Sequence, residues 1–333
     1  MKVLVTGSSG HLGEALCRTL KKNQVAFVGI DLKVGDFTTA IGTIAKRAFV
    51  REVVAGVDYI LHTATLHKPH VATHSKQDFI DTNVTGTLNL LEEAKACGVK
   101  GVIYTSTTST FGDMLTPDKE EPAIWVTEDT PSKPKNIYGV TKNAAEDLCQ
   151  LFYRNHQLPC IILKTSRFFP EEDDKKEIRD TYEDLNIKAN EYLYRRVDVE
   201  DVVTAHLLAM DKVETIGFQK YIISATSLFT EAHLKDLHQS APSVVRQIYP
   251  TFEAIYAQKG WKMLPKIDRV YVNTKARKDL GWQPKYDFQY ILACLKEDKD
   301  FRSPLSIVIG KKGYHEEIFE EGPYPVTQEE KNS

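Results

Sequence analysis

The stretch KVLVTGSSGHLG, residues 2–13, joins an apolar segment to a glycine-rich turn. Its first half, Lys2–Thr6, is predicted to be a buried strand, and a helix with one apolar face is expected over Leu12–Lys22. Three glycines fall where the strand turns into the helix: Gly7, Gly10 and Gly13. Small residues at this place let the backbone approach a phosphate, whose charge the helix N-terminus stabilises. The stretch therefore predicts the first βα unit of a nucleotide-binding sheet.

Apolar runs and amphipathic stretches continue to alternate after this unit. Further strands are predicted at Val25–Asp31, Ala40–Ile44, Val57–Thr63, Gly101–Ser106, Cys160–Lys164 and Lys220–Ser224. Helices are predicted at Ala45–Ala55, Gln77–Cys97 and Asn136–His156, and Val197–Met210 reads as a strand end leading into a helix. This alternation with short connections is typical of the α/β class, as a Rossmann-type, doubly wound parallel sheet.

Two parts of the chain are expected from this pattern. We predict that residues 1–165 form a Rossmann domain that binds NAD and that residues 197–224 return to it. Residues 166–333 are predicted to form mainly a smaller, irregular, C-terminal lobe that binds the substrate, because they show little periodicity. The polar, proline-bearing segment 111–135 is expected to be a long loop.

The bulk composition excludes several classes of function. The 333 residues carry a net charge of −3, which gives no reason to expect binding to nucleic acid or to an anionic membrane. No apolar run approaches the roughly 20 residues that span a bilayer, and no secretory signal is expected. The five cysteines are odd in number and lack C-x-x-C spacing, which favours reduced thiols in a cytoplasmic protein. The histidines at 62, 67, 70 and 74 lack an accompanying carboxylate pattern, so no metal site is predicted.

An acidic residue ends the second predicted strand. Asp31 lies 18 positions after Gly13, where a carboxylate can accept hydrogen bonds from the ribose hydroxyls of adenosine. The same charge would repel a 2′-phosphate. NAD is therefore favoured over NADP, although Lys33 is nearby.

A tyrosine and a lysine lie one helical turn apart in the sequence Tyr138-Gly139-Val140-Thr141-Lys142. A tyrosine with a pKa near 10 needs about 4 kcal/mol of help to act as a base near pH 7. One ammonium group about 4 Å away supplies roughly that much at an effective dielectric constant near 20. The run of hydroxyls that ends the strand at residues 104–109 can hold a substrate oxygen beside the tyrosine.

Several motifs appear in an order that resembles the extended short-chain dehydrogenase/reductase family, in its NAD-dependent epimerase/dehydratase (nucleotide-sugar epimerase) branch. The pattern T-G-x-x-G-x-I/L-G is found at 6–13, D-x-x-x-H-x-A at 58–64, N-x-x-G-T at 83–87 and a strand-end Ser/Thr triplet at 105–107. The pattern Y-G-x-S/T-K is found at 138–142, V-x-D-V at 199–202 and L-G-W-x-P at 280–284.

The resemblance implies roles for individual residues. Tyr138 would be the catalytic acid/base, Lys142 would lower its pKa and bind the nicotinamide ribose, and Thr107 would contact the reacting oxygen. The residues expected at the cofactor are Gly7, Ser9, Gly10, His11, Leu12, Gly13, Asp31, Thr43, Ile44, Thr63, Ala64, Thr65, Asn83, Tyr138 and Lys142. Thr43 is found where many members have an aspartate that contacts adenine.

The substrate candidates are His67, Thr108, Arg167 and Arg196. Arg167 takes the place of an asparagine that often touches substrate in the family. The arginine that often binds a nucleotide-sugar diphosphate aligns near Tyr194, beside Arg195 and Arg196, and a second one is not evident over residues 261–268.

Three functions remain open from the sequence. The first is oxidation of a carbinol carbon of a sugar or sugar-nucleotide-like substrate by hydride transfer to NAD, with Tyr138 as acid/base. The second is an NAD-dependent dehydrogenase or reductase of a non-nucleotide alcohol or ketone, and the third is a non-catalytic, NAD-binding regulatory protein. The resemblance also implies a homodimer formed through the helices near Gln77–Cys97 and Asn136–His156, with a small-molecule substrate as the other partner.

Overall fold

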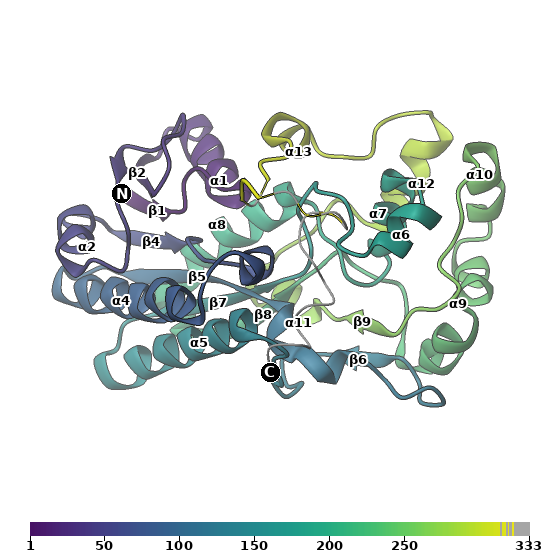
Figure 1. The fold of residues 1–333 in the computed structure, drawn as a ribbon, viewed down its shortest axis with the longest axis horizontal. Coiled ribbons are helices and arrows are strands. Elements are labelled where there is room, and N and C mark those ends of the chain that lie inside the picture. The colour runs from purple at the N-terminus through teal and green to yellow at the C-terminus, as the bar shows by residue number, and fades with distance from the viewer. Residues whose placement is uncertain (314, 318, 320–321, 323–333) are drawn as a thin grey trace.

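A parallel sheet of seven strands forms the centre of the protein (Figure 1). The computed structural model describes residues 1–313, 315–317, 319 and 322. The strand order is β3-β2-β1-β4-β5-β7-β8. The strands are β1 (Lys2–Thr6), β2 (Ala26–Asp31), β3 (Ala40–Ile41), β4 (Tyr59–His62), β5 (Gly101–Thr107), β7 (Cys160–Thr165) and β8 (Phe218–Ile223). All are paired in parallel, so the predicted doubly wound, Rossmann-type sheet is confirmed.

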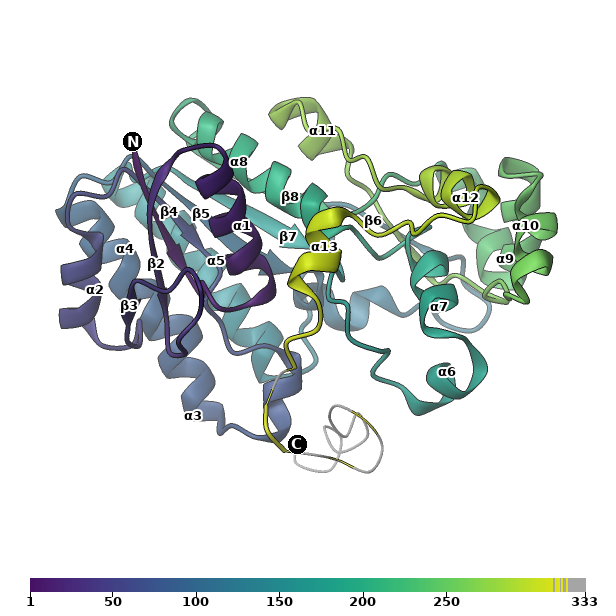
Figure 2. The same cartoon turned by 90° about the horizontal axis from the view of Figure 1, so that it is seen from above.

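Helices cover both faces of this sheet, as Figures 1 and 2 show. One face is covered by α2 (Arg47–Val54), α4 (Gly86–Ala96) and α5 (Ile137–His156), and the other by α1 (His11–Lys22) and α8 (Val199–Ile216). The central strands β1, β4, β5 and β7 are buried on both sides, which explains their nearly continuous apolar sequences. The register aligns Thr6 with Ile30 and His62, so the carboxyl ends of the strands, and the loops that follow them, meet at one edge.

The remaining segments form a lobe beside the carboxyl edge, with its own apolar core. It contains α6 (Lys176–Thr181), α7 (Asp184–Glu191), α9 (Leu234–Ile248), α10 (Phe252–Lys259) and α12 (Phe288–Lys296). Two parallel strands, β6 (Ile124–Val126) and β9 (Arg269–Tyr271), lie between this core and the sheet. The helices α11 (Thr274–Leu280) and α13 (Pro304–Ile309) pack against α8.

The predictions for the less periodic segments were wrong in two places. The C-terminal lobe is largely helical rather than irregular, because its helices are short and bury aromatic side chains that mask a simple period. The segment 111–135, predicted as a loop, contains β6 and the end of a 3₁₀ segment over Thr108–Leu115. The three residues of β6 are too few to show an alternating pattern.

One predicted helix has an interruption that positions the site. The helix expected at Gln77–Cys97 consists of α3 (Lys76–Phe79), a π-helical turn at Ile80–Thr85 and α4. The π-helical turn contains Asn83, which is buried. Such turns are frequent at functional sites because they shift the side chains that follow by one position.

The motifs V-x-D-V and L-G-W-x-P meet each other in the structure. The Asp201 carboxylate accepts hydrogen bonds from the backbone N–H groups of Lys285 at 2.9 Å and Tyr286 at 2.9 Å. The indole N–H of Trp282 donates to the Asp201 carbonyl at 3.0 Å. These bonds tie α8 to the chain that enters α12, so both motifs fix the lobe to the sheet.

Candidate active site

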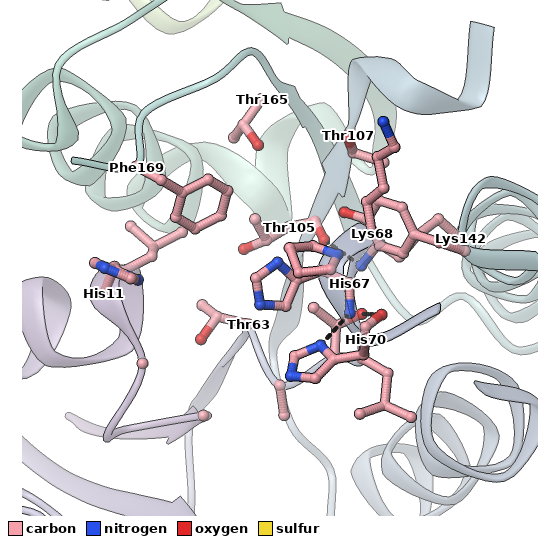
Figure 3. A pocket seen from close by; sticks show the side chains of 18 of the residues that line it. His11, Thr63, His67, Lys68, His70, Thr105, Thr107, Lys142, Thr165 and Phe169 are labelled. Carbon is pink, nitrogen blue, oxygen red and sulfur yellow. Dashed lines mark hydrogen bonds between the residues drawn. The ribbon is translucent and has the colours of Figure 1, made fainter. Parts of the chain in front are cut away.

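The main cavity lies along the carboxyl edge of the sheet and has a volume of about 530 Å³. It extends from the glycine turn after β1 to the lobe. Most of the residues predicted for the site line it: Gly7, Ser9, Gly10, His11, Leu12, Gly13, Asp31, Thr43, Ile44, Thr63, Ala64, Thr65, His67, Thr107, Thr108, Tyr138, Lys142 and Arg167. Segments that are far apart in the sequence therefore meet in one cavity, as Figure 3 shows for ten of its lining residues.

The glycine turn fits a phosphate group. Gly7 has a φ of +74°, and a Cβ on Gly13 would lie 1.9 Å from the Gly7 carbonyl oxygen, so the packing of the turn itself requires glycine at both positions. A Cβ on Gly10 would come no closer than 3.3 Å to any atom, again the Gly7 carbonyl oxygen. Helix α1 begins after Gly10 without a side-chain cap. Its first N–H groups can therefore bind an anion that approaches over Gly10.

Two backbone N–H groups hold the carboxylate of Asp31. Its carboxylate accepts hydrogen bonds from the backbone N–H of Ser9 at 3.0 Å and from that of Lys33 at 3.0 Å. Each oxygen keeps acceptor capacity for a hydroxyl group. The carboxylate thus lies beside the glycine turn and lines the cavity, where it fits the adenosine ribose of NAD.

Tyr138 and Lys142 lie on the first two turns of α5 and are both buried. The Lys142 ammonium donates to the Thr105 carbonyl at 2.6 Å and lies 4.1 Å from the centre of the Tyr104 ring. Burial lowers the pKa of Lys142 to about 7, although the Glu146 carboxylate opposes this shift. Lys142 is therefore close to the point at which it gains or loses its charge near neutral pH.

Burial sets the pKa of Tyr138 in this structure. Burial raises the pKa of Tyr138 to about 12, and a hydrogen bond with Thr107 opposes the shift. In this structure the Lys142 ammonium group donates to the Thr105 carbonyl, at 2.6 Å. Tyr138 is thus a neutral phenol here, which is the form that can donate a proton.

A buried ionic cluster lies directly behind this pair. Glu146, one turn after Lys142, is fully buried and accepts hydrogen bonds from Ser106 at 2.5 Å, Lys164 at 2.7 Å and Lys220 at 2.9 Å. Lys164 also donates to Thr110 at 2.7 Å. Charge-assisted hydrogen bonds of this kind fix α5 against the carboxyl ends of β5 and β7.

Asn83 was predicted to bind the cofactor, but it does not line the cavity. Its amide NH₂ donates to the Leu66 carbonyl and to Thr141, at 2.9 and 3.0 Å. Its amide oxygen accepts from the Leu66 backbone N–H and from Thr65, at 2.9 and 3.0 Å. Because these bonds occupy both donors and both acceptors, Asn83 acts by holding the loop after β4 against α5.

The substrate candidates divide into two groups. His67 and Thr108 line the cavity, and the His67 ring stacks on Phe169 at a centroid distance of 5.4 Å. Figure 3 shows His67 between Phe169 and the side where Lys142 and Thr107 lie. Burial lowers the pKa of His67 well below its usual value, so the imidazole is neutral.

The two predicted arginines are bound within the protein. Arg167 lines the cavity but pairs with Asp173 at 2.9 Å and Asp174 at 3.1 Å. Arg196 does not line the cavity; it is buried and pairs with Glu191 at 2.7 Å. Arg196 was predicted to contact substrate, but the arginine that lines the cavity is its neighbour, Arg195.

Two cavity arginines were missed by the sequence analysis. Arg195 follows α7. Arg269 begins β9 and lies one position after residues 261–268, where the sequence shows no second arginine. Within the described part of the chain, the Nε atoms of both side chains are buried and without a hydrogen-bond partner. A second cavity of about 430 Å³, also lined by Arg195, adjoins this end and contains Lys175, His238 and Lys266.

Three of the histidines considered for a metal site are neighbours in the structure, and His67 and His70 line the main cavity. His67, His70 and His74 lie in a row, with neighbouring ring centroids 4.5 and 5.1 Å apart. No three His, Cys, Asp or Glu side chains among the described residues gather in a way that could hold a metal ion. No helix in that part of the chain is long and apolar enough to cross a membrane.

The fold and the site are those of an α/β protein with a parallel, Rossmann-type sheet and a cavity along its carboxyl edge. Residues 3–223 match the NAD dependent epimerase/dehydratase family, and the chain belongs to that family. The family resemblance and the NAD cofactor predicted from the sequence are thereby confirmed.

Relatives and solved structures agree with this assignment. The UDP-glucose 4-epimerase of Streptococcus mutans is 24% identical over 86% of this chain and 93% of the relative. The dTDP-D-glucose 4,6-dehydratase of Dictyostelium discoideum is 27% identical over 50% of this chain. The chain spans 44% of that dehydratase and 36% to 62% of six further curated relatives.

The solved structures show the similarity of the fold. The structure of UDP-glucose 4-epimerase from Thermotoga maritima with UDP-glucose has a TM-score of 0.62 at 22% identity, over 89% of this chain and 98% of that one. UDP-glucuronic acid 4-epimerase from Bacillus cereus in complex with NAD has a TM-score of 0.59 at 22% identity, over 91% and 100%.

Proposed function

We propose that this protein is an NAD-dependent epimerase that acts on a carbinol carbon of a nucleotide-sugar-like substrate. The observation that carries the proposal is the cavity itself, in which Tyr138, Lys142 and Thr107 lie with the glycine turn and with Arg195 and Arg269. Bound NAD would supply the acceptor for a hydride from the substrate carbon. The chain's own residues then account for the proton, the orientation and the binding energy.

Tyr138 is proposed to exchange the hydroxyl proton of the substrate. The phenol of Tyr138 is hydrogen-bonded to Thr107. The Thr107 hydroxyl can therefore position the reacting oxygen while the Tyr138 hydroxyl takes or returns the proton. Proton removal needs the pKa of Tyr138 to fall from about 12. The Lys142 ammonium can lower it by Coulomb attraction once the ammonium leaves the Thr105 carbonyl for a ribose hydroxyl and turns toward the phenol.

Arg195 and Arg269 are proposed to bind an anionic part of the substrate, such as a diphosphate. Both line the cavity at the lobe, while the glycine turn lies at its other end. Guanidinium groups match phosphate oxygens with paired N–H donors. A substrate anchored there would extend toward His67, Thr108 and Tyr138.

The division into a cofactor domain (1–165, with 197–224) and a substrate lobe (mainly 166–333) also remains a proposal. It is supported by the separate apolar cores of the sheet and the lobe. We likewise propose a homodimer through α4 and α5, since α5 exposes the apolar side chains of Val140 and Leu151. The cytoplasm is the proposed compartment, on the basis of five cysteines without a disulfide.

The proposal is tested by incubating the purified protein with NAD and UDP-glucose, UDP-galactose, UDP-glucuronic acid or the corresponding free sugars. Interconversion of UDP-sugars without net NADH supports the epimerase. Net NADH with a free sugar or another alcohol supports the alternative dehydrogenase. NAD binding without any turnover, unchanged in a Tyr138→Phe variant, would support the regulatory protein.

A further inference from the structure

A segment close to the C-terminus lies against the glycine turn. Helix α13 packs on α1 and α8, and Gly310, with a φ of +59°, ends it (Figure 2). Lys312 and Gly313 then line the main cavity together with residues 7–13. We call Lys311–Gly313 the C-terminal strap.

Glu171 anchors the strap to the cofactor end of the cavity. One of its carboxylate oxygens accepts hydrogen bonds from the backbone N–H groups of Lys312 at 3.0 Å and Gly313 at 3.3 Å. The same oxygen lies 2.8 Å from His11 Nε2. Glu171 and His11 are each only 7% exposed. The carboxylate therefore joins the strap to the first residue of α1, where the phosphate of the cofactor is expected.

Two further contacts hold the strap, one with Glu14 of α1 and one with Glu172. The Lys312 ammonium pairs with Glu14, which also pairs with Arg18 at 2.6 Å. Lys311 pairs with Glu172 at 3.1 Å, but both side chains are more than half exposed. An exposed pair of this kind contributes little, whereas buried charge-assisted contacts are stronger. Glu171 is thus the contact on which the position of the strap mainly depends.

We propose that the C-terminal strap retains the cofactor by covering the glycine turn, so that NAD and NADH dissociate only after the contacts of Glu171 break. This inference rests on the proposed function and sharpens it. An epimerase returns the hydride to the same substrate and needs its cofactor to stay bound through the cycle, whereas a dehydrogenase must release NADH. A strap that slows dissociation favours the epimerase.

The test measures the rate at which bound NADH leaves the protein when excess NAD is added. Four variants are compared with the full chain: a chain that ends at Gly310, a chain that ends at Gly313, Glu171→Ala and its neighbour Glu172→Ala. The chain ending at Gly310 and Glu171→Ala are expected to release NADH at least tenfold faster. The chain ending at Gly313 and Glu172→Ala are expected to stay within twofold of the full chain.

The controls separate the possible outcomes. Circular dichroism and thermal unfolding without cofactor show whether each variant folds. If the chain ending at Gly310 does not fold, NADH release from Glu171→Ala tests the strap. The proposed role of the strap would be overturned if Glu171→Ala released NADH at the rate of the full chain. It would also be overturned if the chain ending at Gly313 released NADH as fast as the chain ending at Gly310. A full chain that binds no NADH would instead refute the proposed function.

Discussion

The two ends of the cavity are built in different ways. At the cofactor end, the residues belong to short sequence motifs: the glycine turn 7–13 with Asp31 after the next strand, and the pair Tyr138 and Lys142 on one helix face. At the substrate end, Arg167, Arg195 and Arg269 come from three separate segments, and acidic neighbours bind part of their charge. Short motifs therefore identify the part of a site whose residues are neighbours in the sequence or on one helix face. They do not identify the part that single residues from separate segments form.

The largest effect is expected from removing both cavity arginines. Arg195→Gln combined with Arg269→Gln should raise the KM for a UDP-sugar by a factor of roughly 100 or more, since hydrogen bonds to charged groups contribute about 1.5–3 kcal/mol each. The kcat should change much less, because neither side chain is the group proposed to transfer the proton. Steady-state kinetics measure both constants.

Arg167→Gln is the matched control for these arginines. Arg167 is partly buried and pairs with Asp173, Asp174 and Glu191, of which Asp173 and Glu191 are buried. Its removal therefore leaves buried carboxylates with fewer partners and should destabilise the fold by about 3 kcal/mol. Its effect should therefore appear in denaturant unfolding. If Arg167→Gln instead raises KM with the stability unchanged, the assignment of roles at the substrate end is wrong.

At the cofactor end, two glycines should respond differently to alanine. A methyl group on Gly13 would meet the Gly7 carbonyl at 1.9 Å, so Gly13→Ala should reduce the free energy of unfolding without cofactor by about 1–3 kcal/mol. Gly10→Ala leaves more space and should mainly weaken NAD binding. Urea unfolding and titration with NAD distinguish them; equal loss of stability would refute the ligand role of Gly10.

A smaller effect concerns the charge of Lys142. Its pKa is lowered to about 7 by burial, and the Glu146 carboxylate opposes this, so Glu146→Gln should move the pKa below 7. The folded pKa lies below the unfolded value near 10.4, so the stability contributed by neutral Lys142 is present above pH 10 and lost as the pH falls through about 7. NMR titration of the ¹³Cε signal of Lys142 measures the shift.

Lys220→Gln is a useful comparison for that titration. Lys220 also contacts Glu146, at 2.9 Å, but it is partly exposed, so water screens its charge. Its removal should change the Lys142 titration less than Glu146→Gln does. A titration that is the same in the wild type and in Glu146→Gln would show that the buried cluster does not tune Lys142.

The sequence predicted the sheet and the cofactor end because strand periodicity and local motifs carry that information. The prediction that Arg196 contacts substrate was not supported, because the neighbouring Arg195 lines the cavity while Arg196 pairs with Glu191. Outside a regular helix, a shift of one position can turn a side chain to the opposite side. Arg269 was missed because its strand is only three residues long. The strap was also missed, because its contacts with Glu171 and Glu14 join residues about 140 and 300 positions apart.

The most direct test of the account compares Tyr138→Phe with the wild type, measuring turnover of the substrate and NAD binding on the same preparation. The account predicts that kcat falls by a factor of about 10²–10⁴, as expected for the loss of a general acid/base, while NAD binds as before. A variant that turns over its substrate at the wild-type rate with NAD bound would contradict the central claim that this phenol transfers the proton.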